Sequence, residues 1–141
     1  MTGKFFVDTN VLIYLFSSKE PGKKLHCRKL INHLDAKNQL VWSTQVMQEF
    51  YSVMTKKHNE DSLEVKASFS LFRNFELVVN DQIMIEKAIE IQILNRLSFW
   101  DSLIISSALA SKCDYLLTED LHRDQTIQGL KIVSPFELKE N

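Results

Sequence analysis

The 141-residue sequence contains few of the residues that form turns and covalent cross-links. It has 3 glycines and 2 prolines, whereas the two together make up roughly 12% of average proteins. This scarcity disfavours a turn-rich all-β sandwich or a glycine-loop nucleotide binder, and it favours a helix-rich domain. The 2 cysteines, Cys27 and Cys113, form no metal-ligand pattern, which indicates free thiols in a reducing compartment.

Long apolar segments and an excess of charge of either sign are also missing. Uncharged stretches such as 9–18 and 102–111 are far shorter than the ~20 apolar residues that span a bilayer. The formal net charge is −1, so the composition does not favour nucleic-acid binding through a basic surface. We therefore expect a soluble cytoplasmic protein without membrane association, in which any nucleic-acid site is local.

What is present is an ordinary globular composition with alternating strand and helix patterns. Residues 27, 30, 31 and 34, for example, are apolar at the spacing of one helix face. The patterns predict helices beginning at residue 10 and covering 21–37, 44–57, 61–74, 82–97 and 99–112, with strands at 5–7, 40–42, 77–79, 115–117 and 130–133. Such alternation favours a single three-layer α/β/α domain over residues 1–141, with a parallel sheet between helices.

Four of the acids are placed where the predicted elements meet. Asp8 ends the first strand, Glu49 lies early in the helix after the second, and Asp120 follows the fourth. Asp101 is in the first turn of the helix that leads into the fourth strand. Ligands of parallel α/β sheets bind outside the carboxyl ends of the strands, so we expect these four carboxylates to share one edge of the sheet.

Clustered carboxylates repel one another. Two like charges ~4 Å apart repel by about 4 kcal/mol at an effective dielectric constant near 20. The sequence places no lysine or arginine among the acids. A hard divalent cation such as Mg²⁺, held by a few carboxylates and water, removes the repulsion and leaves positions for phosphate oxygens. The pattern predicts a metal-dependent phosphoryl-transfer site.

Each acid taken singly also has a structural explanation. Ser98 and Asp101 form an S-x-x-D capping box, and the helix dipole favours an acid in the first turn. Glu49 alone is typical of an acid at a helix boundary, and Asp120 with Asp124 is typical of a solvated loop. Only the convergence of the acids on one edge favours a functional site.

Four sequence blocks together resemble a known family. They are VDTNVL at 7–12, STQV at 43–46 with EF at 49–50, FWDSLI at 99–104, and LTEDL at 117–121. Each block alone is common, but their order and spacing resemble the PIN domain over essentially the whole chain. Among PIN domains, the sequence is most similar to the stand-alone VapC-type toxins of toxin-antitoxin pairs.

The resemblance implies a structure, an activity and partners. It implies a five-stranded parallel sheet and an endoribonuclease that depends on Mg²⁺ or Mn²⁺ and cleaves single-stranded or loop RNA. It further implies hydrolysis by in-line attack of hydroxide, derived from water, on the phosphodiester, so that the 2′-hydroxyl is not the nucleophile. VapC-type proteins usually form homodimers and are silenced by a small antitoxin, so both partners are expected here.

The resemblance also assigns roles to side chains. The acidic catalytic quartet would consist of Asp8, Glu49, Asp101 and Asp120. Asp8, Asp101 and Asp120 would hold the ion directly or through water, and Glu49 would orient water or aid a second ion. The supporting side chains would be Asn10 beside the first acid, the Thr118 hydroxyl at the edge, and Asp124 as an additional acid.

Three other interpretations compete with this one. A receiver-type signalling domain needs paired acids at the first strand, an acceptor Asp at the end of a central strand and a late lysine. Only Asp8 stands at the first strand, and the third strand ends at Asn80 and Asp81 without other support. A haloacid-dehalogenase-type phosphatase needs Asp-x-Asp after the first strand, but Asn10 stands in place of the second acid. A non-catalytic RNA- or protein-binding module with the PIN fold remains open, because sequence does not reveal activity.

Overall fold

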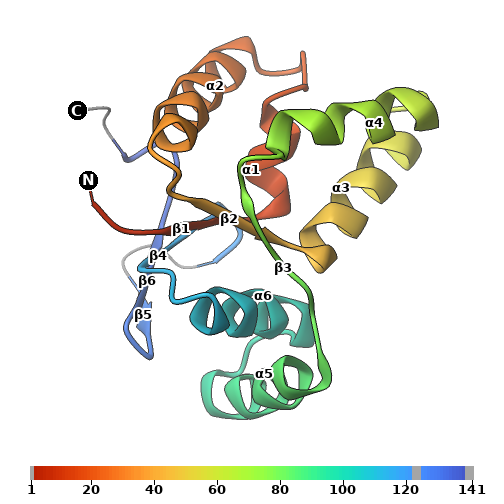
Figure 1. The fold of residues 1–141 in the computed structure, drawn as a ribbon. Helices are drawn as coiled ribbons and strands as arrows, with labels where there is room; N and C mark the ends of the chain where they lie inside the picture. The colour runs from red at the N-terminus through yellow and green to blue at the C-terminus, as the bar shows by residue number, and fades with distance from the viewer. Residues whose placement is uncertain (1, 122–124, 139–141) are drawn as a thin grey trace.

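A computed structural model describes residues 2–121 and 125–138 of the chain. Strands and helices alternate through most of it (Figure 1). The elements are β1 (Phe5–Val7), α1 (Thr9–Tyr14), α2 (Pro21–Ala36), β2 (Leu40–Ser43), α3 (Thr44–Lys56), α4 (Ser62–Ser68), the 3₁₀ helix η1 (Phe69–Phe72), β3 (Glu76–Val78), α5 (Gln82–Asn95), α6 (Phe99–Ala110), β4 (Tyr115–Leu117), β5 (Thr126–Ile127) and β6 (Leu130–Val133).

One mostly parallel sheet forms the centre of the fold. Its strand order is β3-β2-β1-β4-β6-β5, and every neighbouring pair is parallel except β5 with β6. Helices α1 to α4 lie on one side of the sheet, and α6 packs on the other side against β2, β4 and β6 (Figure 1). The expected α/β architecture, with helices on both faces of the sheet, is confirmed.

The sheet has six strands, so the expected number of five was wrong. The additional strand, β5, is two residues long and pairs antiparallel with β6 across Gln128 and Gly129. These residues have φ values of 50° and 88°, as a two-residue hairpin turn that matches the strand twist requires. A glutamine rarely adopts positive φ, so the sequence gives little sign of this turn.

Polar residues at the ends of the preceding segments start most of the helices. The side chains of Ser43, Asp61, Asp81 and Ser98 accept hydrogen bonds from backbone N–H groups in the first turns of α3, α4, α5 and α6. Asp8 caps α1 in the same way. Each cap stabilises its helix by about 1 kcal/mol. Two of the caps, Asp8 and Ser43, lie where β1 and β2 end, which places polar side chains at the carboxyl edge of the sheet.

An aromatic cluster holds the α3–α4 side of the fold against the sheet. The indole of Trp42 makes edge contacts with the rings of Phe69, Phe72 and Phe75, with centroid distances of 6.0, 5.1 and 6.0 Å. The helix expected over 61–74 changes to the 3₁₀ form at Phe69. Phe72 and Phe75 are buried in this cluster.

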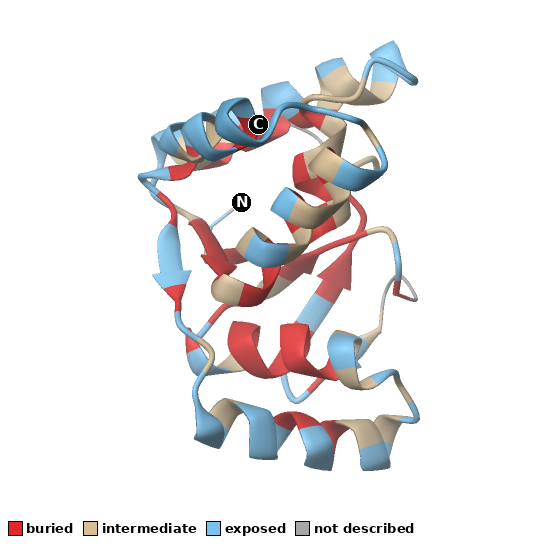
Figure 2. Cartoon of the chain, turned by 90° about the vertical axis from the view of Figure 1, so that its right-hand side faces the viewer, coloured by how far each residue is buried: buried red, intermediate tan, exposed pale blue. Residues whose placement is uncertain are grey.

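Helix α5 is the outermost layer on the other side of the sheet. Its buried residues, Ala88 and Ile91, face α6, with which α5 makes its main contact. Figure 2 shows α6 mostly buried and α5 largely exposed. The exposed α5 side chains include Ile83, Ile93 and Leu94, an unusual number of large aliphatic groups for a surface helix. Within the described residues, no helix is long and apolar enough to cross a membrane.

Candidate functional site

Asp8 lies at the carboxyl end of β1 and is 6% exposed. One carboxylate oxygen accepts a hydrogen bond from the backbone N–H of Thr9 at 2.7 Å. The other accepts one from the hydroxyl of Thr118 at 2.8 Å. The side chain is therefore held in one orientation by the start of α1 and by the end of β4.

The hydroxyl of Thr118 connects three segments at this edge. Besides donating to Asp8, its oxygen accepts hydrogen bonds from the side-chain amide of Asn10 at 3.3 Å and from the backbone N–H of Asp120 at 3.1 Å. Thr118 directly follows β4, which is paired with β1. The expected supporting residues Asn10 and Thr118 thus lie beside Asp8, and Asp120 begins the loop next to them.

Glu49 reaches the same edge from the second turn of α3. Its carboxylate accepts hydrogen bonds from the Thr9 hydroxyl at 3.2 Å and from the side-chain amide of Gln45 at 2.7 Å. The same Gln45 nitrogen donates to the backbone carbonyl of Trp100 at 3.1 Å. Gln45 therefore joins Glu49 to the first turn of α6, where Asp101 follows Trp100.

Asn80, just after β3, holds the start of α3 against α6. Its side-chain oxygen accepts hydrogen bonds from the Thr44 hydroxyl at 3.0 Å and from the backbone N–H of Gln45 at 3.1 Å. Its side-chain nitrogen donates to the Ser107 hydroxyl at 2.6 Å. This network sets the position of the α3 turn that carries Gln45 and Glu49.

The electrostatics of the edge are dominated by carboxylates. Burial raises the pKa of Asp8 from its ordinary value of 3.8 to about 6, although the hydrogen bonds from Thr118 and Thr9 lower it. The negative charges of Asp120 and Glu49 raise it further. Asp8 therefore experiences the repulsion from both acids that the sequence pattern predicts.

The donor atoms at this edge suit a hard cation. Among residues 2–121 and 125–138, no three His, Cys, Asp or Glu side chains form a ready metal-binding group. Mg²⁺ does not require one, because it is usually held by one or two carboxylates together with water. The side-chain oxygen of Asn10 is buried and has no hydrogen-bond partner in the described part of the chain. This oxygen and the buried carboxylate of Asp8 are the features that a cation would satisfy.

Among the described residues, Lys23 lies near the acidic edge, beside the residue that precedes Asp120. The Lys23 ammonium is 3.9 Å from a carboxylate oxygen of Glu119, the residue before Asp120. It is also 3.4 Å from the Tyr14 hydroxyl and lies over the rings of Tyr14 and Phe136. The helical crossover from α1 to α2 brings Lys23 there, and no local sequence pattern marks it.

The structure thus brings most, but not all, of the expected site residues together. Asp8, Glu49 and Asp120 interact through their charges, and Asn10 and Thr118 connect to them by hydrogen bonds.

The other two expected residues, Asp101 and Asp124, are not joined to this group by a described contact of their own side chains. Asp101 is connected to this edge through its neighbour, because the carbonyl of Trp100 binds Gln45. The backbone N–H of Asp101 donates to the capping hydroxyl of Ser98 at 3.1 Å, which agrees with the capping explanation. Asp124 lies outside the described residues.

Sequence reasoning missed Thr9 and Gln45. Both lie close in sequence to residues that were expected. Thr9 follows Asp8 directly, and Gln45 precedes Glu49 by one helical turn, the spacing at which helix side chains meet. That spacing could have identified Gln45 as the partner of Glu49.

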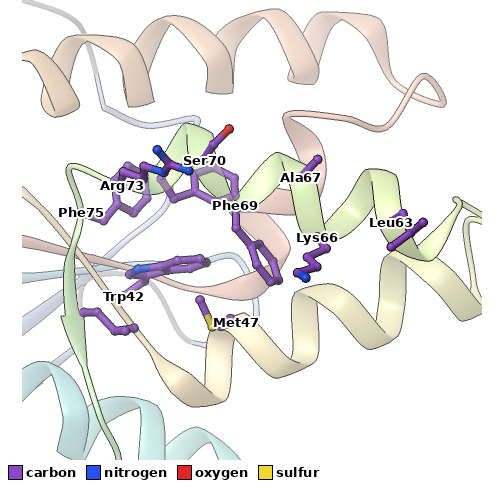
Figure 3. Close-up of a pocket in the computed structure, with 11 residues that line it drawn as sticks. Trp42, Met47, Leu63, Lys66, Ala67, Phe69, Ser70, Arg73 and Phe75 are labelled. Carbon is purple, nitrogen blue, oxygen red and sulfur yellow. The ribbon is translucent and has the colours of Figure 1, made fainter.

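A cavity larger than any at the acidic edge described here lies elsewhere in the described part of the structure. Figure 3 shows it between Trp42 and Met47 on one side and the residues of α4 and η1 on the other. It measures about 640 Å³, and among the described residues its lining is mostly apolar and includes no carboxylate. Its charged groups are Lys66 and Arg73. It is an apolar hollow separate from the acidic edge.

Comparison with known proteins points to one family. The PIN domain family matches residues 5–126. A toxin-antitoxin complex from Klebsiella pneumoniae is similar in structure, with a TM-score of 0.72, 21% identity, and coverage of 96% of this chain and 100% of that one. No curated protein sequence matches the chain.

Two further solved structures have the same fold at low identity. DNA-bound VapBC from Salmonella typhimurium has a TM-score of 0.69 and 21% identity, covering 95% of this chain and 99% of that one. VapC20 from Mycobacterium tuberculosis, described as a Sarcin-Ricin loop cleaving toxin, has a TM-score of 0.65 and 15% identity, covering 80% and 87%. These structures share the fold of the chain, and the match of the family over residues 5–126 shows that the chain belongs to the PIN domain family.

Proposed function

We propose that this protein is a metal-dependent endoribonuclease that hydrolyses RNA phosphodiester bonds. The observation that carries the proposal is the buried carboxylate of Asp8, whose pKa is raised to about 6 by burial and by the charges of Asp120 and Glu49. Such an arrangement, at the carboxyl edge of a parallel sheet in a PIN domain, suits a divalent cation. The similarity to VapC20, which is described as a Sarcin-Ricin loop cleaving toxin, supports RNA as the substrate.

In this proposal, three of the acids hold the metal ion and the fourth orients water. Asp8, Asp101 and Asp120 would hold Mg²⁺, or Mn²⁺ in its place, directly or through water. When bound, the ion would supply Lewis-acid chemistry and offset the charge of the phosphate. Glu49, kept in position by hydrogen bonds from Thr9 and Gln45, orients the attacking water.

Four further side chains support the acids. Thr118 holds Asp8 in its orientation through a 2.8 Å hydrogen bond. Asn10 offers its buried side-chain oxygen, and Asp124, four residues after Asp120 in the sequence, adds a further negative charge. Lys23 keeps a positive charge beside Glu119, which reduces the repulsion at the outer end of the acidic edge.

The same proposal covers the partners. The protein acts as the toxin of a VapBC-type pair, forms a homodimer and is silenced by a small antitoxin. The similar structure from Klebsiella pneumoniae is a toxin-antitoxin complex, and the one from Salmonella typhimurium is a DNA-bound VapBC. The exposed aliphatic side chains of α5, which include Ile83, Ile93 and Leu94, provide an apolar surface that suits a protein partner.

Incubation with RNA tests the activity. The purified protein, free of any co-purifying partner, is mixed with total cellular RNA and Mg²⁺ or Mn²⁺, with EDTA and Asp8→Asn as controls. We expect discrete cleavage products that disappear in both controls. Intact RNA in the presence of a folded, metal-binding protein would contradict the proposal and favour a non-catalytic RNA- or protein-binding role.

A further inference from the structure

Trp100 is 64% exposed, which is unusual for the largest apolar side chain. It occupies the second position of α6, immediately before Asp101. The neighbouring ring of Phe99 lies at 5.1 Å from the indole, with the two planes nearly perpendicular at 78°. An exposed aromatic face, supported by a second ring, thus stands next to the acidic edge.

The indole forms one wall of a groove that also contains a candidate catalytic acid. The groove has a volume of about 420 Å³ and is lined by Gln45, Gln48, Glu49 and Trp100. A single nitrogen of Gln45 bonds both the Glu49 carboxylate and the Trp100 carbonyl. Because Gln45 is 5% exposed, this link is shielded from water, and the position of Trp100 is coupled to that of Glu49.

The chemistry of the groove suits a nucleobase better than a phosphate. Of the described residues that line it, none is a cation that would bind phosphate. The surface that lines the groove is mostly apolar, as the flat face of a base requires, and the side chains of Gln45, Gln48 and Glu49 add polar groups to it. One aromatic face can stack on any base, and the exposed amide of Gln48 can both donate to and accept from a base edge.

We propose that Trp100 is the stacking platform for an unpaired base next to the phosphodiester bond that is cleaved. A base inside a duplex has both faces covered by its neighbours, so only an unpaired base can stack on the indole. This inference rests on the proposed ribonuclease function and adds a specificity-determining residue to it. Trp100 positions the RNA, and the acids beside it act on the backbone.

Binding measurements without catalysis test the inference. Fluorescence anisotropy in EDTA measures the affinity of the wild type and of Trp100→Ala for a short labelled single-stranded RNA and for a duplex of the same sequence. We expect Trp100→Ala to weaken single-strand binding about 5- to 100-fold and to leave duplex binding unchanged. Trp100→Phe, which keeps an aromatic face, restores most of the affinity.

A matched control uses Leu63→Ala, because Leu63 is also large and exposed but lines the separate apolar hollow. We expect its RNA affinity to equal that of the wild type. Equal affinity of Trp100→Ala and the wild type for the single strand would overturn the inference, as would equal losses for single strand and duplex. A change in the sedimentation coefficient of Trp100→Ala with unchanged RNA affinity would instead make Trp100 a protein contact.

Measurements of binding and of cleavage distinguish a failure of this inference from a failure of the ribonuclease proposal. If the wild type cleaves RNA with Mn²⁺ but Trp100→Ala binds and cleaves equally well, the stacking role is wrong and the nuclease stands. If Trp100→Ala loses single-strand affinity but the wild type cleaves nothing, the base platform stands and the catalytic proposal is wrong.

Discussion

Replacing Asp8 by asparagine removes one negative charge from the acidic edge and keeps the shape of the side chain. Burial, together with the charges of Asp120 and Glu49, raises the pKa of Asp8 in the folded protein to about 6. In the unfolded chain the pKa is near 3.8. Because the folded-state pKa is the higher one, the free energy of unfolding of the metal-free protein falls as pH rises from about 4 to about 7.

The size of this effect follows from the two pKa values. The gap between the two pKa values, 3.8 and about 6, corresponds to a total loss of about 3 kcal/mol in the free energy of unfolding. About 2 kcal/mol of this loss occurs between pH 4 and pH 7. The asparagine side chain has no charge to lose, but its amide nitrogen cannot accept the hydrogen bond that Thr118 now donates, at a cost of about 1 kcal/mol. We expect Asp8→Asn to be slightly less stable than the wild type at pH 4 and about 2 kcal/mol more stable at pH 7.

Urea unfolding of both proteins in EDTA, at pH 4 and at pH 7, measures this difference directly. Titrating groups far from Asp8 contribute equally to both proteins and cancel in the comparison. The dependence of the unfolding free energy on urea concentration should be the same for both, which would show that the exposed surface is unchanged. If the difference in unfolding free energy between Asp8→Asn and the wild type is the same at both pH values, the reasoning is refuted.

Three substitutions test other parts of the account. Glu49→Gln should leave the unfolding free energy within about 1 kcal/mol of the wild type. In a gel-based time course with Mn²⁺, it should slow cleavage at least about 100-fold. Cleavage at the wild-type rate would exclude a catalytic role for Glu49. Thr118→Val removes three hydrogen bonds around Asp8 and should destabilise the protein by about 1–3 kcal/mol in thermal unfolding, and an unchanged Tm would show that they add no net stability. Gly129→Ala forces a side chain onto a residue with φ of 88° and should destabilise the protein by about 1–2 kcal/mol without altering cleavage; slower cleavage would mean that the hairpin influences the acidic edge.

Much of the fold is predictable because local patterns and tertiary packing agree. The apolar runs Phe5–Val7 and Tyr115–Leu117 are strands as expected, and they pair side by side in the sheet. The exceptions are local. Strand β5 is only two residues long, so it has no periodic pattern, and its turn depends on a positive φ at Gln128. The 3₁₀ segment begins at Phe69, whose ring packs against Trp42, and a local sequence pattern does not encode this contact between distant residues.

The site is predictable to the extent that strand ends determine it. Asp8 and Thr118 follow directly from the ends of β1 and β4, and the helix after β2 carries Glu49 to the same edge. Lys23 could not be found, because its place beside Glu119 depends on how α2 crosses the sheet. The role of Gln45 depends on a contact between α3 and α6, which are far apart in sequence.

The most direct test of the central claim joins metal binding to cleavage in one preparation. Mn²⁺ binding by titration calorimetry and the rate of RNA cleavage are measured over the same range of Mn²⁺ concentration, for the wild type and for Asp8→Asn. We predict that the wild-type binding and cleavage curves rise together and that Asp8→Asn, although folded, loses both. Cleavage that persists in EDTA, or in Asp8→Asn at the wild-type rate, would contradict a metal-dependent site at the acidic edge.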